Sequence, residues 1–231
     1  TTVRVRPGAC GNLFLNSIGS AYMKKLVTSA DQLAGVFVGL LGLIVAISWV
    51  FQSETIAMLV PGSAKMGIVS PTLFMAAGFC CYFTMNRGRG APWLDKTWQV
   101  LAALLLAVPA LVLVQHIFDV SLGLDFVRVR TAPTPDRPHP GRMAPNTCIA
   151  FFLTGAALHL ARGSLPGRLR LAALAASASL VTLIGAGALL GYILKLEMMY
   201  RIAAANVMQL PTAAGMIMLG LGGSSYTKDF A

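Results

Sequence analysis

Polar side chains recur along this chain where they could together hold a small molecule with a polar head and an apolar body. Three stretches follow one rule, in which Met, Ser or Thr, Phe or Met, and Gly stand four residues apart. Spacings of four place side chains on one face of a helix. The members are Met66, Ser70, Phe74 and Gly78; Met143, Thr147, Phe151 and Gly155; and Met208, Thr212, Met216 and Gly220. The rule predicts one structural unit used three times.

A ring side chain ends the apolar segment that precedes each repeat. Rings give flat apolar contact, hydroxyls and helix N-termini give hydrogen-bond donors, and a charged guanidinium stands where the second repeat begins. We expect these side chains to meet at the outer end of a helical bundle. The predicted ligand-binding residues are Trp49, Ser70, His116, Arg142, Asn146, Thr147, Tyr192 and Thr212. A quinone or a lipid would fit this chemistry, and haem or a pigment held through His116 is a further alternative.

The same residues have a second explanation in helix architecture alone. Each repeat has a proline beside its Ser or Thr, and proline is tolerated in the first helical turn. A hydroxyl there can satisfy a backbone N–H that would otherwise stay bare near hydrocarbon. Glycine lets neighbouring helices approach closely, so Gly78, Gly155 and Gly220 are the predicted helix-packing positions. Ligand binding and helix anchoring both remain open at this point.

Catalytic and metal-binding patterns are missing from the sequence. The four cysteines have no metal-ligand spacing, and they are expected to pack as small apolar side chains. His116 falls near the outer end of its helix and His159 near the inner end of its own, so the two cannot share one haem, whereas His139, among prolines, is expected to be exposed to solvent. The apolar segments carry almost no ionisable residue except at their ends, which argues against ion transport. We expect no enzymatic activity in this chain.

The composition of the chain indicates a membrane environment rather than water. Hydrophobic residues make up 56% of it and charged residues 11%, and the mean hydropathy is +0.73. A soluble domain has roughly twice that charged fraction. Six apolar runs approach the ~20 residues needed to cross a bilayer, near 32–51, 67–86, 98–118, 144–161, 170–194 and 204–222. The predicted fold is all-α and integral to a membrane, with six transmembrane helices arranged as three hairpins with a pseudo-threefold repeat.

The distribution of basic residues predicts the orientation of this bundle. With both termini in the cytoplasm, 11 of the 18 Lys and Arg residues lie on the cytoplasmic side and seven lie outside. Residues 1–31 are predicted to be a cytoplasmic or interfacial segment, 32–222 the membrane domain, and 223–231 a cytoplasmic tail. The basic residues that give the net charge of +10 cluster beside the helix ends. Because this distribution is typical of a membrane protein, we expect no nucleic-acid partner. Expected partners are the lipid bilayer, a second copy of the chain or other membrane subunits.

Two segments resemble a known family. The run from Pro140 to Thr147, PGRMAPNT, followed by CIAFFLTGAALHL, is similar to a GRMSPNT-type signature. That signature occurs in the membrane-embedded N-terminal regions of bacterial sensor histidine kinases and diguanylate cyclases. The segment from Leu190 to Tyr192, with Met208 to Gly220 after it, looks like the closing part of such regions. The resemblance spans about residues 32–222, but the other repeats lack the Asn of Asn146, His116 stands where Tyr is usual, and no output-domain pattern follows.

This resemblance implies a sensory input module in a bacterial inner membrane, as in two-component signal transduction. Such a module would bind a hydrophobic or amphipathic cue and signal to a cytoplasmic output domain that this chain lacks. The alternative is an accessory membrane subunit of a larger complex that holds lipid, quinone or pigment without catalysis.

Overall fold

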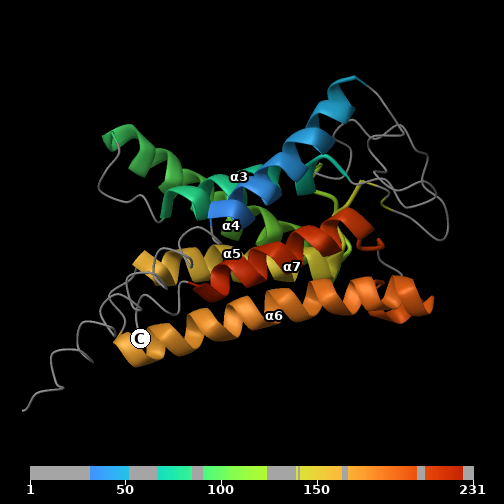
Figure 1. Ribbon diagram of the computed structural model, residues 1–231. Coiled ribbons are helices and arrows are strands. Elements are labelled where there is room, and N and C mark those ends of the chain that lie inside the picture. The colour runs from blue at the N-terminus through green and yellow to red at the C-terminus, as the bar shows by residue number, and fades with distance from the viewer. Residues whose placement is uncertain are drawn as a thin grey trace, which may run out of the picture.

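The computed structural model describes residues 32–51, 67–84, 91–123, 139, 141–162, 166–201 and 206–225. Across these ranges the regular structure is helical and includes no strand. The helices lie side by side in one bundle (Figure 1). They are Gln32–Val50, α3 (Val69–Thr84), α4 (Pro92–Phe118), α5 (Pro145–Arg162), α6 (Gly167–Leu194), the short 3-10 helix η2 (Glu197–Met199) and α7 (Leu210–Ser225). The expected all-α class is therefore confirmed for the described residues.

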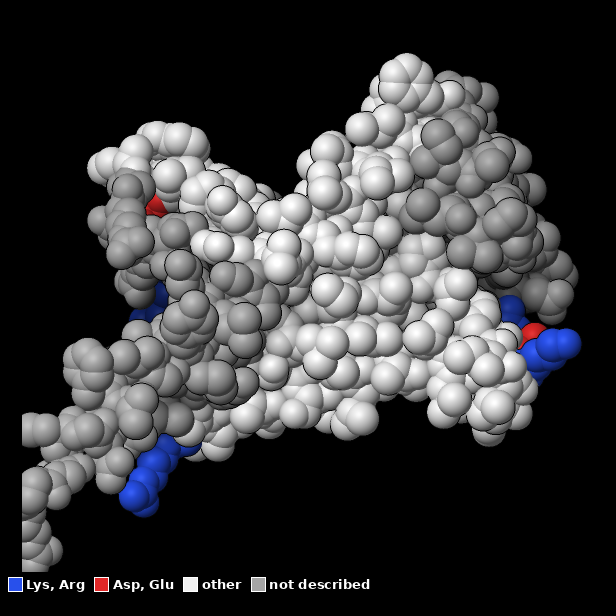
Figure 2. Space-filling model, viewed as in Figure 1, with Lys and Arg blue, Asp and Glu red and all other residues white. Residues whose placement is uncertain are grey.

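Three of these helices are long and apolar enough to cross a membrane, which indicates a membrane protein. They are Gln32–Val50, α4 and α6, and α3 and α7 are shorter apolar helices. Large apolar side chains are exposed on all three long helices, such as Leu33, Val100 and Ile193, as a lipid-facing surface requires. In the face drawn in Figure 2, charged side chains gather at the two ends of the bundle and leave an uncharged band between them.

The observed helix boundaries depart from the apolar runs at several ends. Helix α4 begins at Pro92 rather than near 98, because proline suits the first turn and the charged turn that follows continues the same helix. Helix α7 begins at Leu210 rather than near 204, and residues 206–209 precede it as non-helical chain. It also runs to Ser225, beyond the expected domain limit at 222. The predicted N-terminal segment 1–31 and most of the C-terminal tail lie outside the described residues.

Each glycine of the repeat packs against the helix that precedes its own helix. A Cβ atom at Gly78 would lie 2.6 Å from the backbone of the helix Gln32–Val50, at Gly35 O and Gly39 N. At Gly155 it would lie 2.8 Å from the backbone of Leu105 in α4. At Gly220 it would lie 2.6 Å from Thr182 N in α6. Even a methyl group at these positions would force the facing backbone to shift, so all three glycines lie where two helices pack at close range.

The three helix pairs share one antiparallel register. The repeat glycines face Gly39, the Leu105–Leu106 peptide and Thr182, and residues 39, 106 and 182 each lie ten positions before the ring residues at 49, 116 and 192. A second close approach repeats nearer the ring. A Cβ at Gly42 would lie 2.5 Å from Pro71 O, and one at Gly185 would lie 2.7 Å from Ala213 O. Both glycines stand seven residues before their ring residue, where α4 has the buried Pro109.

The repeat helices α3, α5 and α7 meet in the centre of the bundle. Phe74 and Phe151 contact edge to face, with their ring centroids 4.8 Å apart. A Cβ at Gly215 of α7 would lie 2.7 Å from the ring of Phe74. Phe74, Phe151 and Met216, the third members of the three repeats, are fully buried. Their spacing thus marks the core-facing side of each repeat helix, as the sequence rule predicts.

Candidate functional site

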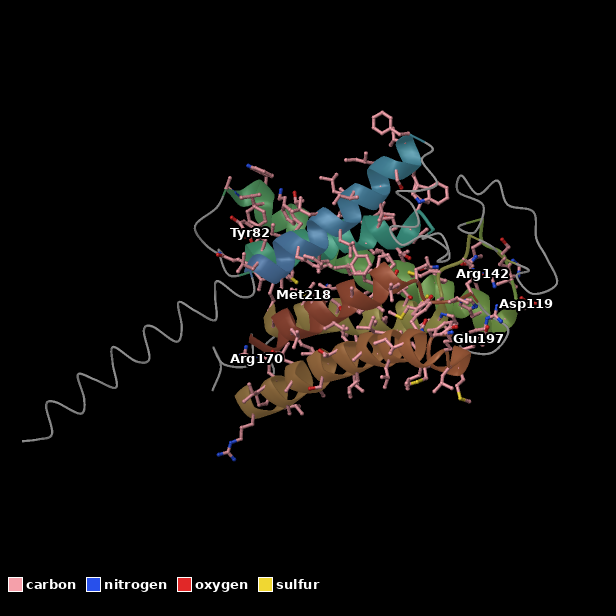
Figure 3. The ribbon with its side chains drawn as sticks, turned by 45° about the vertical axis from the view of Figure 1, so that its right-hand side comes forward. Tyr82, Asp119, Arg142, Arg170, Glu197 and Met218 are labelled. Atoms are coloured by element: carbon pink, nitrogen blue, oxygen red, sulfur yellow. The ribbon has the colours of Figure 1, made fainter. Side chains whose placement is uncertain are left out.

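The predicted ligand-binding residues lie at one end of the bundle, which we call the outer end. This end contains the last turns of α4 and α6 and the first turns of α5 and α7. Figure 3 places Asp119, Arg142 and Glu197 there and Arg170 at the opposite end. The polar residues Ser70, Arg142, Asn146, Thr147 and Thr212 are buried, whereas the rings of Trp49, His116 and Tyr192 are half-buried.

Two of the ring side chains make the same contact in their respective helix pairs. The Nε2 atom of His116 lies 2.8 Å from the carbonyl oxygen of Met143, so Nε2 must carry the proton that is shared. The hydroxyl of Tyr192 donates to the carbonyl oxygen of Met208 at 2.7 Å. Met143 and Met208 are the first members of their repeats. Each ring therefore fastens the end of one helix to the start of the next, which is an anchoring role. Met66, the corresponding residue in the first unit, lies outside the described residues.

The Arg142 guanidinium closes the C-terminal end of α4. Its Nη1 donates to Gln115 O at 3.1 Å and its Nη2 donates to Val120 O at 2.8 Å. The last carbonyl groups of a helix lack intrahelical partners, and a cation there also interacts favourably with the helix dipole. The side chain of Arg142 is 2% exposed, and its Nη1 lies 4.0 Å from the exposed carboxylate of Asp119. Burial among carbonyl oxygens gives this arginine a structural task.

Two asparagines join the second unit to the third. Asn146 donates from Nδ2 to Tyr200 O at 3.4 Å, and its Oδ1 accepts from Thr147 N at 2.9 Å. Asn206 donates from Nδ2 to His139 O at 2.6 Å and also to Arg142 O. These bonds connect the start of α5 with the chain that leads into α7, so the outer ends of the two units cannot move independently without breaking them.

The hydroxyls of Thr147 and Thr212 do not bond as predicted. The Oγ1 of Thr147 is buried and has no hydrogen-bond partner, so the expectation that it satisfies a helix N–H is wrong. Asn146 supplies that oxygen instead. The hydroxyl of Thr212 donates to Gln209 Oε1 at 3.3 Å, so its partner is a side chain and not a backbone N–H. The expectation that His139 is exposed to solvent is also wrong, because its side chain is 25% exposed and its Nε2 lies 3.4 Å from Asp119 Oδ1.

Sequence reasoning missed several residues of this end. Tyr200 stacks on Tyr192 with the ring centroids 4.2 Å apart and the planes within 6°. Gln115 is fully buried one residue before His116. Asn206 lies two residues before Met208, whereas Asn146 lies inside its repeat, so the two asparagines share no spacing, and Gln115 and Tyr200 follow no spacing rule either. Among the described residues, no group of three His, Cys, Asp or Glu side chains could hold a metal ion.

A second polar cluster lies at the inner end and joins α3, α4 and α5. The Nε1 of Trp98 donates to Cys80 O at 3.1 Å and to Thr84 Oγ1 at 3.0 Å. The guanidinium carbon of Arg162 lies 3.4 Å from the centre of the Trp98 ring, and its Nη2 donates to Asp95 Oδ1 at 3.1 Å. This stacked cation and its partners fasten the inner end as Arg142 fastens the outer end.

Comparison of the chain with family models, with curated proteins and with solved structures gives no match. The functional reading therefore depends on the site itself.

Proposed function

We propose that this chain is a membrane-embedded, non-catalytic input module that binds an amphipathic cue at its outer end. The supporting observation is the pair of asparagine bonds that join the start of α5 to the chain preceding α7. A ligand that competes for these bonds would shift α7 relative to α5. Helix α7 is the last described helix and begins at the outer end. A shift of α7 would therefore pass along it to its C-terminal end and to an output domain that follows. Such signalling requires two packings that the ligand stabilises to different extents.

We further propose that the bundle crosses the membrane six times, as three hairpins related by a pseudo-threefold axis. The shared register of the three helix pairs and the central position of α3, α5 and α7 support this arrangement. Helices α3 and α7 have 16 residues each, about 24 Å by helical rise, which is shorter than a bilayer core of about 30 Å. Non-helical chain before each repeat helix supplies the missing length. Such chain is tolerated in a membrane where protein buries it, as at 141–144.

The proposed orientation places the outer end outside the cytoplasm of a bacterium and both termini inside. Reporter fusions after Asn86 and after Arg162 are expected to read as cytoplasmic, and a fusion near Pro135 as external, because basic residues favour the inner side. Paired alkaline phosphatase and fluorescent reporters measure this directly. The opposite pattern at all three sites would reverse the orientation and move the proposed binding surface to the cytoplasmic side.

A second candidate function is an accessory subunit that holds lipid, quinone or pigment in a larger assembly. The observation that favours it is the use of His116, Tyr192 and Arg142 in bonds within the fold. Polar atoms that already form hydrogen bonds within the protein have less capacity to bind a diffusible cue. The same bonds make the outer end rigid. A rigid body suits an assembly subunit better than a switch.

Hydrogen exchange distinguishes the two functions. The purified chain in nanodiscs would be measured with and without decylubiquinone, an amphipathic quinone. An input module is expected to change exchange at the outer end and also along α7, because Asn146 and Asn206 connect the two. An Asn206→Ala variant would retain the change at the outer end and lose it in α7. A change confined to the outer end in the unaltered chain would instead support the accessory subunit, and no response at either place would remove quinones as the cue.

A further inference from the structure

A carboxamide without any hydrogen bond is buried at the outer end. Gln115 in the last turn of α4 is fully buried, and neither its Nε2 nor its Oε1 has a partner in the part of the chain that the structure describes. The hydroxyl of Thr147, in the first turn of α5, is also buried and unpartnered. Buried polar groups nearly always have partners, because each missing hydrogen bond carries a desolvation penalty. Two such groups at one end of the bundle indicate that a further molecule supplies their missing hydrogen bonds.

The two side chains lie at nearly the same level of adjacent helices. Gly155 of α5 faces the peptide between Leu105 and Leu106 of α4, which fixes the antiparallel register. Eight residues back from Gly155 is Thr147, and eight residues on from Leu106 is Val114, next to Gln115. The contacts of neighbouring residues agree, because His116 bonds to the carbonyl of Met143 and Arg142 bonds to the carbonyl of Gln115. Gln115 and Thr147 therefore lie within about one helical turn of each other along the bundle axis.

The other two units show that the fold does not require these unpaired groups. The residue that precedes the ring is Ser48 in the first unit, whose hydroxyl donates to Val45 O at 2.6 Å, and Gly191 in the third. The third unit also pairs its repeat hydroxyl, because Thr212 donates to Gln209. Among the residues compared, a buried amide and a buried hydroxyl without partners occur together in the second unit alone. The first and third units have small or hydrogen-bonded side chains at the positions compared. The unpaired amide and hydroxyl of the second unit are therefore not required for helix packing.

The chemistry of the two groups specifies what they hold. The carboxamide offers N–H donors and a carbonyl acceptor, and the threonine hydroxyl can donate or accept. A carbonyl or an ether from a ligand would only accept, so it would leave Gln115 Oε1 unpaired. A charged group would carry a large desolvation penalty here, because the Arg142 guanidinium already serves two carbonyl oxygens. We propose that Gln115 and Thr147 form an internal site for one uncharged hydroxyl group, carried by an ordered water or by the head of an amphiphile.

Thermal unfolding of near-isosteric variants in phosphatidylcholine nanodiscs tests this site. Gln115→Met and Thr147→Val are each expected to lower Tm by about 2–6 °C, because the bound hydroxyl loses a partner. Thr154→Val is the matched control, since that hydroxyl donates to Ala150 O within α5 at 2.9 Å. A Gln115→Met variant that unfolds at a higher temperature than the unaltered protein would overturn the proposal, because removal of a truly unpaired amide relieves its penalty.

Added amphiphiles identify the source of the hydroxyl. If a lipid head supplies it, oleyl alcohol raises the Tm of the unaltered protein and of Thr154→Val but not of Gln115→Met, whereas 1-octadecene has no such effect. If water supplies it, neither compound shifts the Tm while the Gln115→Met loss remains. A high-resolution map should show a non-protein oxygen beside the Gln115 carboxamide. A map in which Gln115 bonds directly to Thr147 with no atom between would contradict the site, and none of these results depends on signalling through α7.

Discussion

Gly78→Ala is expected to lower the free energy of unfolding by about 2–3 kcal/mol, or Tm by about 4–12 °C. The added methyl would meet backbone atoms of the helix Gln32–Val50 at 2.6 Å, and backbone cannot move aside as a flexible side chain can. The two helices must separate, and every contact along their interface weakens. Gly155→Ala and Gly220→Ala are expected to have effects of the same size, because their contacts with α4 and α6 repeat this geometry.

Gly187→Ala in α6 is the matched control for these glycine variants. A Cβ at Gly187 would meet nothing within 4 Å, and alanine favours a helix over glycine by up to about 1 kcal/mol. The control should therefore unfold at the same temperature as the unaltered protein or slightly above it. Thermal unfolding followed by tryptophan fluorescence compares the four variants. Equal stability of Gly78→Ala and Gly187→Ala would contradict the shared register of the helix pairs.

Arg142→Ala is expected to lower the free energy of unfolding by about 2–4 kcal/mol, because it leaves Gln115 O and Val120 O without their donors at the end of α4. Arg142→Lys should recover only part of this loss, since an ammonium group cannot reproduce the fork of the guanidinium. Arg168→Ala, an exposed change in the first turn of α6, should stay within about 0.5 kcal/mol of the unaltered protein. The same nanodisc unfolding experiment measures all three.

The Arg142 variants also separate the two interpretations of the outer end. An anchoring residue loses stability on substitution while native mass spectrometry finds the same co-purified molecules as before. A ligand-binding residue shows the reverse, with bound molecules lost and Tm preserved. The buried contacts of Arg142 with two carbonyl oxygens predict the first result.

The parts of the fold that repeat were predictable from the sequence. Spacings of four marked the buried face of each repeat helix, and Phe74, Phe151 and Met216 are buried as that pattern requires. Close packing at the repeat glycines was predictable, because helices approach most closely where a side chain is absent. The positions of glycines can be read directly from the sequence. Helix starts were less predictable. Hydropathy reports the extent of an apolar run, whereas α4 continues into a charged turn and α7 begins six residues inside its run.

The hydrogen bonds of the outer end were not predictable, because they join residues far apart in the chain. Asn146 and Tyr200 are 54 residues apart, and Asn206 and His139 are 67 apart. No local pattern specifies such a pair. Gln115 gave no signal either, because one polar residue at the end of an apolar segment usually faces the headgroup layer. Its burial depends on packing against neighbouring units.

An experimental structure in a lipid nanodisc tests the central claim most directly. That claim is one hairpin geometry used three times around a central trio of helices. We predict that each hairpin superposes on the next by a rotation of one third of a turn about an axis normal to the membrane. Ser70, Thr147 and Thr212 should then lie at one depth in the bilayer. Three unrelated rotations, or three different depths for these residues, would contradict the account.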